Sequence, residues 1–290
     1  MDPDKEVQAS VEPEDNDNQK IWEELEKTAF DRIIASTHDF CLFMRDLFVP
    51  DEAILIPPEG GCPEITTESF ASLEEDDKVI NVLRHMTYMK RYCTGDNYRI
   101  LRDTGMCNWQ DAHVVQTITR GDGKRMRFMT ETPKDPVPSD VIGLCDGGRA
   151  CGILLLNCTD GIVHWYGCAE FASDAYDECS RWAREEDDLF RCGRLVRWPV
   201  EEFFKCIKGR FRSMEQLPKN GYEVLTSEDE GDGHMRTLKD VYKRYGWPDN
   251  FQKAECAAAV KELEEKLRRE YFAERGPLPA LQHLAVCTDT

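Results

Sequence analysis

Residues 152–156, Gly-Ile-Leu-Leu-Leu, form a short run without a polar side chain. The turn-forming sequence Thr159-Asp160-Gly161 comes shortly after this run, and residues 162–166 then combine β-branched and aromatic side chains. A strand that is apolar on both faces must be covered on both faces. We therefore predict that 152–156 belongs to a central strand of a sheet that helices cover.

The neighbouring sequence predicts more strands of the same sheet. Residues 114–119 are rich in β-branched side chains, and in 124–132 Arg125 and Arg127 alternate with Met126 and Phe128. Strands are expected at 114–119, 124–132, 141–145, 150–157 and 162–166. Since tight Gly- and Asp-rich turns join them, we predict an antiparallel sheet of about five strands within residues 113–167.

Helical periodicity appears on both sides of this region. Apolar residues recur at steps of three and four from Ile21 to Phe48 and again over 74–91. Pro199 is expected at the first position of a third helix, and a short helix should end at Gly246. The apolar faces are expected at Trp22, Leu25, Ala29, Ile33, Thr37, Cys41, Met44 and Phe48, at Val200, Phe203, Phe204, Ile207, Phe211 and Met214, and, in a final helix after Asp249, at Cys256, Val260, Leu263, Leu267 and Tyr271. The last stripe fits either the core or a partner helix.

The predicted order, in which helices precede the sheet and further helices follow it, is typical of the α+β class. Residues 1–20 carry seven acids, two lysines and almost nothing to bury, which predicts a disordered acidic tail. We expect a single α+β domain over 21–273, with a charged insertion near 170–191 and an acidic loop near 226–233. Residues 274–290 are expected to form a flexible tail.

Charge and cysteine usage restrict the class of partner and the compartment. A net charge of −19 opposes binding to nucleic acid, which needs cations against phosphate. No apolar stretch is long enough to span a membrane, and the acidic start lacks a signal sequence. The 13 cysteines contain no Cys-x-x-Cys pair, so we expect reduced, buried thiols in the cytoplasm or nucleus.

Neither a metal nor a nucleotide cofactor is expected. Cys145, Cys151, Cys158 and Cys168 surround His164 in the sequence, but their spacing does not match a zinc site. The Gly-rich segments 121–124 and 146–149 lie between predicted strands, where hairpin turns explain them better than phosphate binding.

Two sets of residues are candidates for function. Asp111, His113 and His164 could form an acid–base site if their loops converge, although such pairs also arise by chance among 56 acids. A basic island, in which seven cations stand against Glu201 and Glu202, could bind an acidic partner or the acidic tail. It comprises Arg191, Arg194, Arg197, Lys205, Lys208, Arg210 and Arg212. A solvated helix face is the simpler explanation of the island.

Four segments carry a resemblance to known proteins. In order, they are Val82-Leu-Arg-His-Met-Thr-Tyr-Met89, residues 152–165, Trp198-Pro-Val-Glu-Glu-Phe-Phe204 and Val241-Tyr-Lys-Arg-Tyr-Gly-Trp-Pro248. Over residues 75–272 the chain resembles a group of uncharacterised fungal proteins, which usually have proline where Thr87 stands. The strand ending in Val163-His164-Trp165, followed by a Phe-rich helix, is distantly similar to the SUKH superfamily of cell-wall assembly regulators and toxin-immunity proteins. That superfamily usually has an acid where Asn157 stands.

The resemblance implies an α+β binding module that acts by surface complementarity, and it carries over no active site. We therefore expect an intracellular, non-enzymatic protein-binding or regulatory module, whose protein partner could be acidic. The alternatives are a small-molecule enzyme that uses Asp111, His113 and His164, and a structural subunit. A structural subunit would expose apolar area on the last helix.

Overall fold

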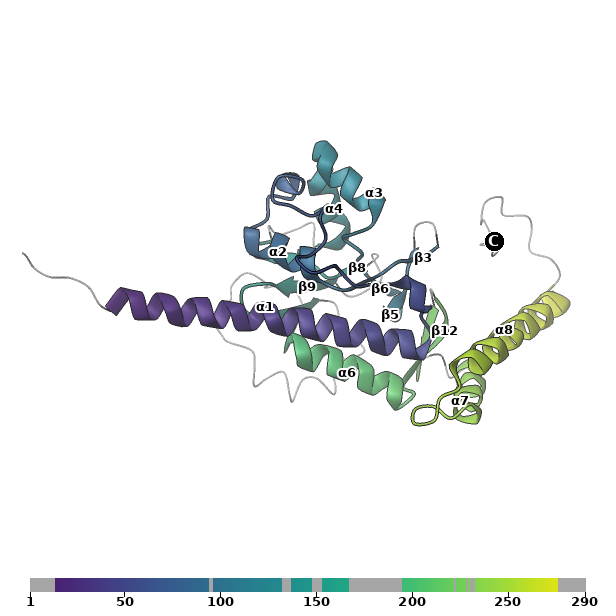
Figure 1. The fold of residues 1–290 in the computed structure, drawn as a ribbon. Coiled ribbons are helices and arrows are strands. Elements are labelled where there is room, and N and C mark those ends of the chain that lie inside the picture. The colour runs from purple at the N-terminus through teal and green to yellow at the C-terminus, as the bar shows by residue number, and fades with distance from the viewer. Residues whose placement is uncertain are drawn as a thin grey trace, which may run out of the picture.

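The computed structural model describes residues 14–93, 96–131, 137–147, 153–166, 195–221, 223–227, 229 and 233–275. Helices α1 (Glu14–Leu47) and α6 (Val200–Arg212) lie side by side and form one layer (Figure 1). Phe40 of α1 stacks on Phe204 of α6, with ring centroids 4.6 Å apart, and both side chains are buried. The Arg32 guanidinium donates two hydrogen bonds, of 3.0 and 2.9 Å, to the Glu201 carboxylate. Aromatic packing and ion pairing thus join the two helices.

The predicted apolar faces of these helices are confirmed where side chains are described, except at Phe48, which follows the end of α1 and is only partly buried. All six residues predicted for the face of α6 and its end are buried, as are Ala29, Ile33, Thr37, Cys41 and Met44 of α1. Glu201 and Glu202 lie in the first turn of α6, and Arg210 and Arg212 lie in the last, in line with the helix dipole. Pro199 is the N-cap residue, one position before the predicted one.

The main sheet has the strand order β11-β10-β9-β7, and all its pairs are antiparallel. Its strands are β7 (Val141–Gly143), β9 (Ile153–Asn157), β10 (Ile162–Tyr166) and β11 (Leu195–Pro199). The three leucines of β9 are fully buried. Helix α6 packs on β10 and β11, whereas α4 (Gly123–Thr130) packs on β7 from the other side in Figure 1. The prediction of a central, helix-covered strand is confirmed.

The remaining strands form small antiparallel sheets. A three-stranded sheet has the order β5-β6-β8, and three pairs stand apart from it: β1-β2, β3-β4 and β12-β13. Their bounds are β1 (Ile54–Leu55), β2 (Tyr88–Met89), β3 (Arg91–Cys93), β4 (Asp96–Asn97), β5 (Arg99–Leu101), β6 (Thr104–Met106), β8 (Cys145–Gly147), β12 (Gln216–Asn220) and β13 (Glu223–Thr226). The fold is therefore α+β, but its sheets are small and divided.

The prediction of about five strands within 113–167 is wrong at its start. Residues 114–119 and 124–132 fall in α3 (Ala112–Thr117), in the π-helical turn η3 (Ile118–Asp122) and in α4. Val114 and Ile118 are buried one helical turn apart, as are Met126 and Thr130, whereas Phe128 is 66% exposed. Burial at a spacing of four residues outweighs the β propensity of these segments.

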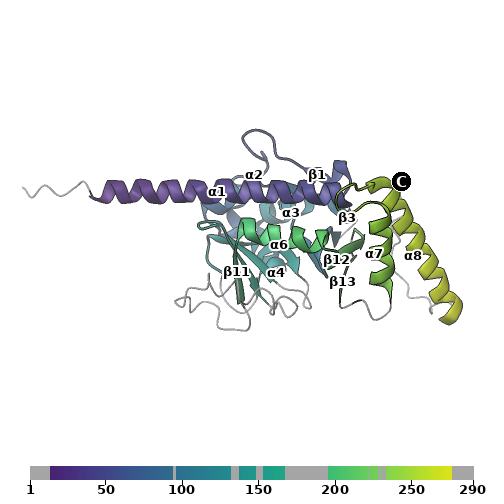
Figure 2. The ribbon, with the colours of Figure 1, turned by 90° about the horizontal axis from the view of Figure 1, so that it is seen from below.

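Three of the other helices differ from prediction mainly in their ends, and two short 3-10 helices were not predicted. They are η1 (Asp51–Ala53), η2 (Ala71–Leu73), α2 (Asp77–His85), α7 (His234–Arg244) and α8 (Lys253–Arg275). Helix α2 is shorter than the predicted 74–91, because the chain enters β2 at Tyr88. Figures 1 and 2 place α7 and α8 at one end of the molecule, from which α8 leads away.

The predicted end of the acidic tail, at residue 20, is wrong. Helix α1 begins at Glu14, so residues 14–20 are helical, as the good helix propensity of Glu, Gln and Lys and the acids near the helix start allow. Residues 1–13, the charged insertion near 170–191 and residues 276–290 lie outside the described residues. In the predicted acidic loop, Thr226 ends β13, and its backbone N–H donates to Asp229 Oδ2 at 2.9 Å.

Two helical glycines provide a matched test of packing. A Cβ atom at Gly123, the first residue of α4, would lie 2.4 Å from the backbone of Ser72, whereas one at Gly209 in α6 would meet nothing within 4 Å. We expect Gly123→Ala to lower the free energy of unfolding by about 1–3 kcal/mol. Gly209→Ala should raise it by about 0.5–1 kcal/mol. Urea unfolding measures both, and equal effects would contradict the close contact at Gly123.

Candidate functional site

A surface pocket of about 610 Å³ lies against the face of α3 and η3. Its walls also include residues of β1 and of the loop that follows β1. The lining residues are Leu55, Glu64, Gln110, Ala112, Val115, Gln116, Thr119 and Arg120. The apolar residues come from β1 and α3, and a lining of apolar groups with a few polar groups is usual for a ligand site.

The Cys62 thiol joins two residues of the pocket lining, Glu64 and Gln110. The thiol donates to Glu64 Oε2 at 3.0 Å, and Gln110 Nε2 donates to Cys62 Sγ, also at 3.0 Å. Gln110 Oε1 is buried and has no hydrogen-bond partner in the part of the chain that the structure describes. The hydrogen bond from Cys62 lowers the pKa of Glu64, so this carboxylate is ionised at neutral pH. Among these groups, the Glu64 carboxylate is the acceptor that the pocket can offer to a ligand, because Gln110 Oε1 is buried.

Cys62 is not suited to nucleophilic chemistry. Its side chain is fully buried, and burial, followed by its hydrogen bond to Glu64, raises the pKa of the thiol. A catalytic cysteine needs a lowered pKa and access to substrate. Cys62 instead fixes the positions of Glu64 and Gln110.

The other charged group of the pocket comes from the π-helical turn. Thr119 and Arg120 lie in η3, where Gly121 adopts φ 94°, a left-handed conformation that suits glycine. Arg120 is exposed and has no ion-pair partner among the described residues. A π-helical turn changes which side chains share a helix face, and such turns are frequent at functional sites.

Hydrogen bonds to η2 hold η3 in place. Ser72 Oγ donates to the Ile118 carbonyl at 2.6 Å and accepts from the Gly123 backbone N–H at 3.0 Å. The close approach at Gly123 follows from this contact. Because η3 lies between α3 and α4, Ser72 positions the wall of the pocket.

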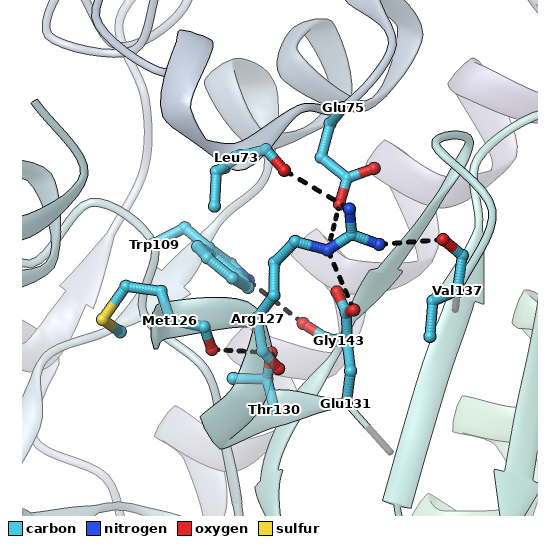
Figure 3. A network of polar contacts seen from close by, with 9 residues as sticks. All are labelled: Leu73, Glu75, Trp109, Met126, Arg127, Thr130, Glu131, Val137 and Gly143. Atoms are coloured by element: carbon cyan, nitrogen blue, oxygen red, sulfur yellow. Dashed lines mark hydrogen bonds and ion pairs between the residues drawn. The ribbon is translucent and has the colours of Figure 1, made fainter. Parts of the chain in front are cut away.

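A buried network centred on Arg127 anchors the next helix (Figure 3). Arg127 Nε lies 2.9 Å from Glu75 Oε1 and donates to Glu131 Oε2 at 2.9 Å. The terminal nitrogens donate to the carbonyls of Leu73, at 3.3 Å, and Val137, at 3.0 Å. The side chain of Glu75 is fully buried and that of Glu131 is 5% exposed. The guanidinium thus ties α4 to η2, to the start of α2 and to the segment before β7.

Burial makes one carboxyl of this network a weak acid. Burial raises the pKa of Glu75 to about 9, against the attraction of Arg127, and Glu75 Oε2 has no hydrogen-bond partner among the described residues. Burial also raises the pKa of Glu131, but the charge and hydrogen bond of Arg127 oppose this shift. At neutral pH we therefore assign the proton to Glu75 and the ion pair to Arg127 and Glu131. None of the three residues lines the pocket, so their role is structural.

The structure places Asp111 and His113 together at the start of α3, whereas His164 lies on β10. Asp111 is the N-cap residue of α3, accepts hydrogen bonds from the backbone of His113 and Val114, and lies 3.5 Å from Arg91 Nε. His113 is exposed in the first turn of α3. His164 is buried in the middle of β10, opposite Leu155 and Arg197. None of the three predicted residues lines the pocket, although Asp111 stands between two residues that do.

The basic island is largely paired within the chain where it is described. Lys205 pairs with Glu202 at 3.1 Å, Arg210 lies 3.9 Å from Glu215, and Lys208 pairs with Asp39 of α1. The Arg212 guanidinium lies 5.2 Å from the centre of the Phe43 ring, and Arg197 lies in β11. Arg191 and Arg194 lie outside the described residues. Binding of an acidic partner here stays a prediction.

Comparisons with known proteins do not identify a family. No family model, curated protein or solved structure matches this chain. The resemblances to the fungal group and to the SUKH superfamily therefore stay predictions. Over the described ranges, no helix is both long and apolar enough to cross a membrane. The same ranges contain no group of three His, Cys, Asp or Glu side chains arranged to hold a metal ion.

The protonated state of Glu75 predicts a pH dependence of stability. A carboxyl whose pKa is raised on folding, here from 4.5 to about 9, stabilises the folded state at low pH. That stability is lost as the pH rises through this window, by at most about 1.4 kcal/mol per pH unit. Glu75→Gln mimics the protonated form, so its stability relative to the unsubstituted protein should increase from pH 5 to pH 9.

Urea unfolding at pH 5, 7 and 9 measures this difference. Glu74→Gln is the matched control, because Glu74 is the neighbouring acid, is 61% exposed and pairs with Lys124. Its effect should be the same at each pH. A constant difference between Glu75→Gln and the unsubstituted protein would show that Glu75 is ionised in the folded state.

Removal of Arg127 should be far more costly. Arg127→Leu leaves the buried Glu131 carboxylate without its cation, so we expect a loss of about 3–5 kcal/mol in the free energy of unfolding at pH 7. Adding Glu75→Gln and Glu131→Gln to this variant should restore part of the loss, because no buried charge then remains. Chemical denaturation tests both steps. A loss below about 1 kcal/mol for the single variant would contradict the anchoring role.

Proposed function

We propose that the protein is a non-enzymatic protein-binding module of the cytoplasm or nucleus, and that α8 is its main contact surface. One observation carries this proposal: the apolar stripe of α8 continues beyond the part of the helix that the body covers. Cys256 and Val260 are buried where α8 packs on α7 and β12. Leu263 and Leu267 are only partly buried, and Tyr271 is 43% exposed. Both views show this helix leaving the body (Figures 1 and 2).

The pattern of α8 suits an amphipathic partner helix. Val260, Leu263, Leu267 and Tyr271 are spaced by three, four and four residues, which gives a narrow seam of the kind that pairs helices. Residues 261–275 contain five acids and five bases. A helix that binds the surface of an anionic membrane would instead carry an excess of Lys and Arg. The favoured partner is therefore a helix with its own apolar seam and flanking charges of both signs.

The state of the cysteines supports the proposed compartment. None of the seven cysteines whose side chains the structure describes forms a disulfide bond. Six of the seven are buried, and burial raises the pKa values of Cys41 and Cys256 to about 12. Such thiols behave as small apolar core groups, which suits a reducing environment.

Substitutions on α8 test the proposed surface. The double variant Leu267→Glu and Tyr271→Glu places two charges in the seam. The matched control, Ala257→Glu and Ala258→Glu, adds the same two charges at exposed positions of the same helix. We expect a stoichiometric partner to be captured from a native extract by the unsubstituted protein and by the control. Capture by the seam variant should fall by about tenfold or more.

Circular dichroism before each capture establishes that the variants are folded. Retention of the partner at moderate salt is expected, since the seam is apolar and exposed charges are screened. Equal capture by seam variant and control, or failure to capture any stoichiometric partner, would overturn the proposal.

A further inference from the structure

Three hydroxyl groups of the chain precede concentrated negative charge. Ser72, Thr226 and Ser227 are the serines and threonines that have at least two acids within the next three residues. Ser72 precedes the acids at 74–75, and Thr226 and Ser227 precede the acidic run 228–230. A kinase that modifies such a residue carries cations in its substrate groove, because charge complementarity selects its substrates. The sequence therefore offers three candidate sites for one class of enzyme.

The structure separates the three hydroxyl groups by their accessibility. Ser72 is partly buried, and its Oγ donates to the Ile118 carbonyl at 2.6 Å and accepts from the Gly123 backbone N–H at 3.0 Å. Thr226 is only 2% exposed. Ser227 follows β13 directly and is exposed, and its side chain has no hydrogen-bond partner among the described residues. Because phosphoryl transfer needs a hydroxyl that can enter the active site of a kinase, Ser227 is the one of the three that meets this requirement.

Asp229 holds the backbone on both sides of Ser227. Its Oδ2 accepts a hydrogen bond of 2.9 Å from the backbone N–H of Thr226, the residue before Ser227. Its Oδ1 lies 3.1 Å from the Nη2 of Arg102, which stands in the turn between β5 and β6. The side chain of Asp229 is 20% exposed, whereas Ser227 is exposed. The serine is thus attached to the body of the protein while its side chain stays accessible.

We propose that Ser227 is a phosphorylation site for a protein kinase that prefers acidic substrates. In this reaction, Ser227 Oγ attacks the γ-phosphorus of ATP in the kinase, and the bond from that phosphorus to the bridging oxygen of the β-phosphate breaks. The hydroxyl proton passes to the catalytic aspartate of the kinase, and ADP leaves. The product carries a charge of about −1.5 to −2 at neutral pH. The proposal does not depend on the α8 surface.

A kinase assay on the full chain tests the proposal. The folded protein is incubated with Mg²⁺, ATP and an acid-directed serine/threonine kinase, and mass spectrometry locates each phosphoryl group. We expect phosphorylation at Ser227 and about tenfold or more less at Ser72, whose hydroxyl is already engaged in two hydrogen bonds. Synthetic peptides 66–80 and 221–235 are the controls. Both peptides should react, because neither hydroxyl is engaged in them.

Variants test the contribution of the acids. The double variant Glu228→Gln and Glu230→Gln removes two negative charges next to Ser227, so the rate of phosphorylation should fall by about tenfold or more. The matched control, Glu52→Gln and Glu59→Gln, removes the same charge at exposed positions far from Ser227 in the sequence. This control should react at the rate of the unsubstituted protein.

The comparison of Ser227 with Ser72 is made within one unsubstituted molecule, so it does not depend on the folding of any variant. Absence of phosphate at Ser227 in the folded chain would overturn the proposal. So would equal phosphorylation of Ser72 and Ser227 in the folded chain, or equal rates for the acid variant and its control.

Discussion

The guanidinium of Arg127 imposes the constraint on which the pocket side of the structure depends. A mostly buried guanidinium must have its donors paired, and here the partners come from four places in the sequence: Leu73, Glu75, Glu131 and Val137. Satisfying them fixes α4 against η2 and against the segment that leads into β7. A buried ion pair need not increase the free energy of unfolding, but removal of one partner lowers it strongly, because the other charge is left buried without a counterion. Its main effect is to specify a single position for α4.

The fixed position of α4 also determines the position of η3, which lies at the surface. Helix α4 continues directly from η3, and Ser72 binds both sides of that junction, at Ile118 and Gly123. The partly buried hydrogen bonds of Ser72 therefore fix the position of the pocket wall that carries Thr119 and Arg120. Elsewhere in the lining, Cys62 joins Glu64 to Gln110. Ser72 and Cys62 thus hold lining residues in place without lining the pocket themselves, which is the arrangement that preorganised binding requires.

The sequence correctly predicts those parts of the fold in which the spacing of apolar residues matches the residues that are buried. The faces of α1 and α6 follow from apolar spacing, and the β9–β10 hairpin follows from the turn between an apolar run and a β-branched one. Arg127 shows where this reasoning fails. Its alternation with Met126 and Phe128 resembles a half-exposed strand, yet its side chain is only 17% exposed and belongs to a helix. Asp111, which caps α3, was the local signal for a helix there. The pocket itself could not be predicted, because Glu64 and Gln110 share no motif and meet only through tertiary contacts.

The distribution of charge indicates how such a chain can recognise a partner. Cations of the basic island contribute to the contact between α1 and α6: Lys208 pairs with Asp39, and Arg212 lies over Phe43. A cation that is already paired must lose that interaction before it can bind an external acid, so it adds little net affinity. Arg120 faces no such competition, because it has no ion-pair partner among the described residues, and Leu267 in the seam of α8 is only partly buried. We therefore expect a partner to bind where charged or apolar side chains lack a contact within the chain, rather than where the sequence contains the most charge.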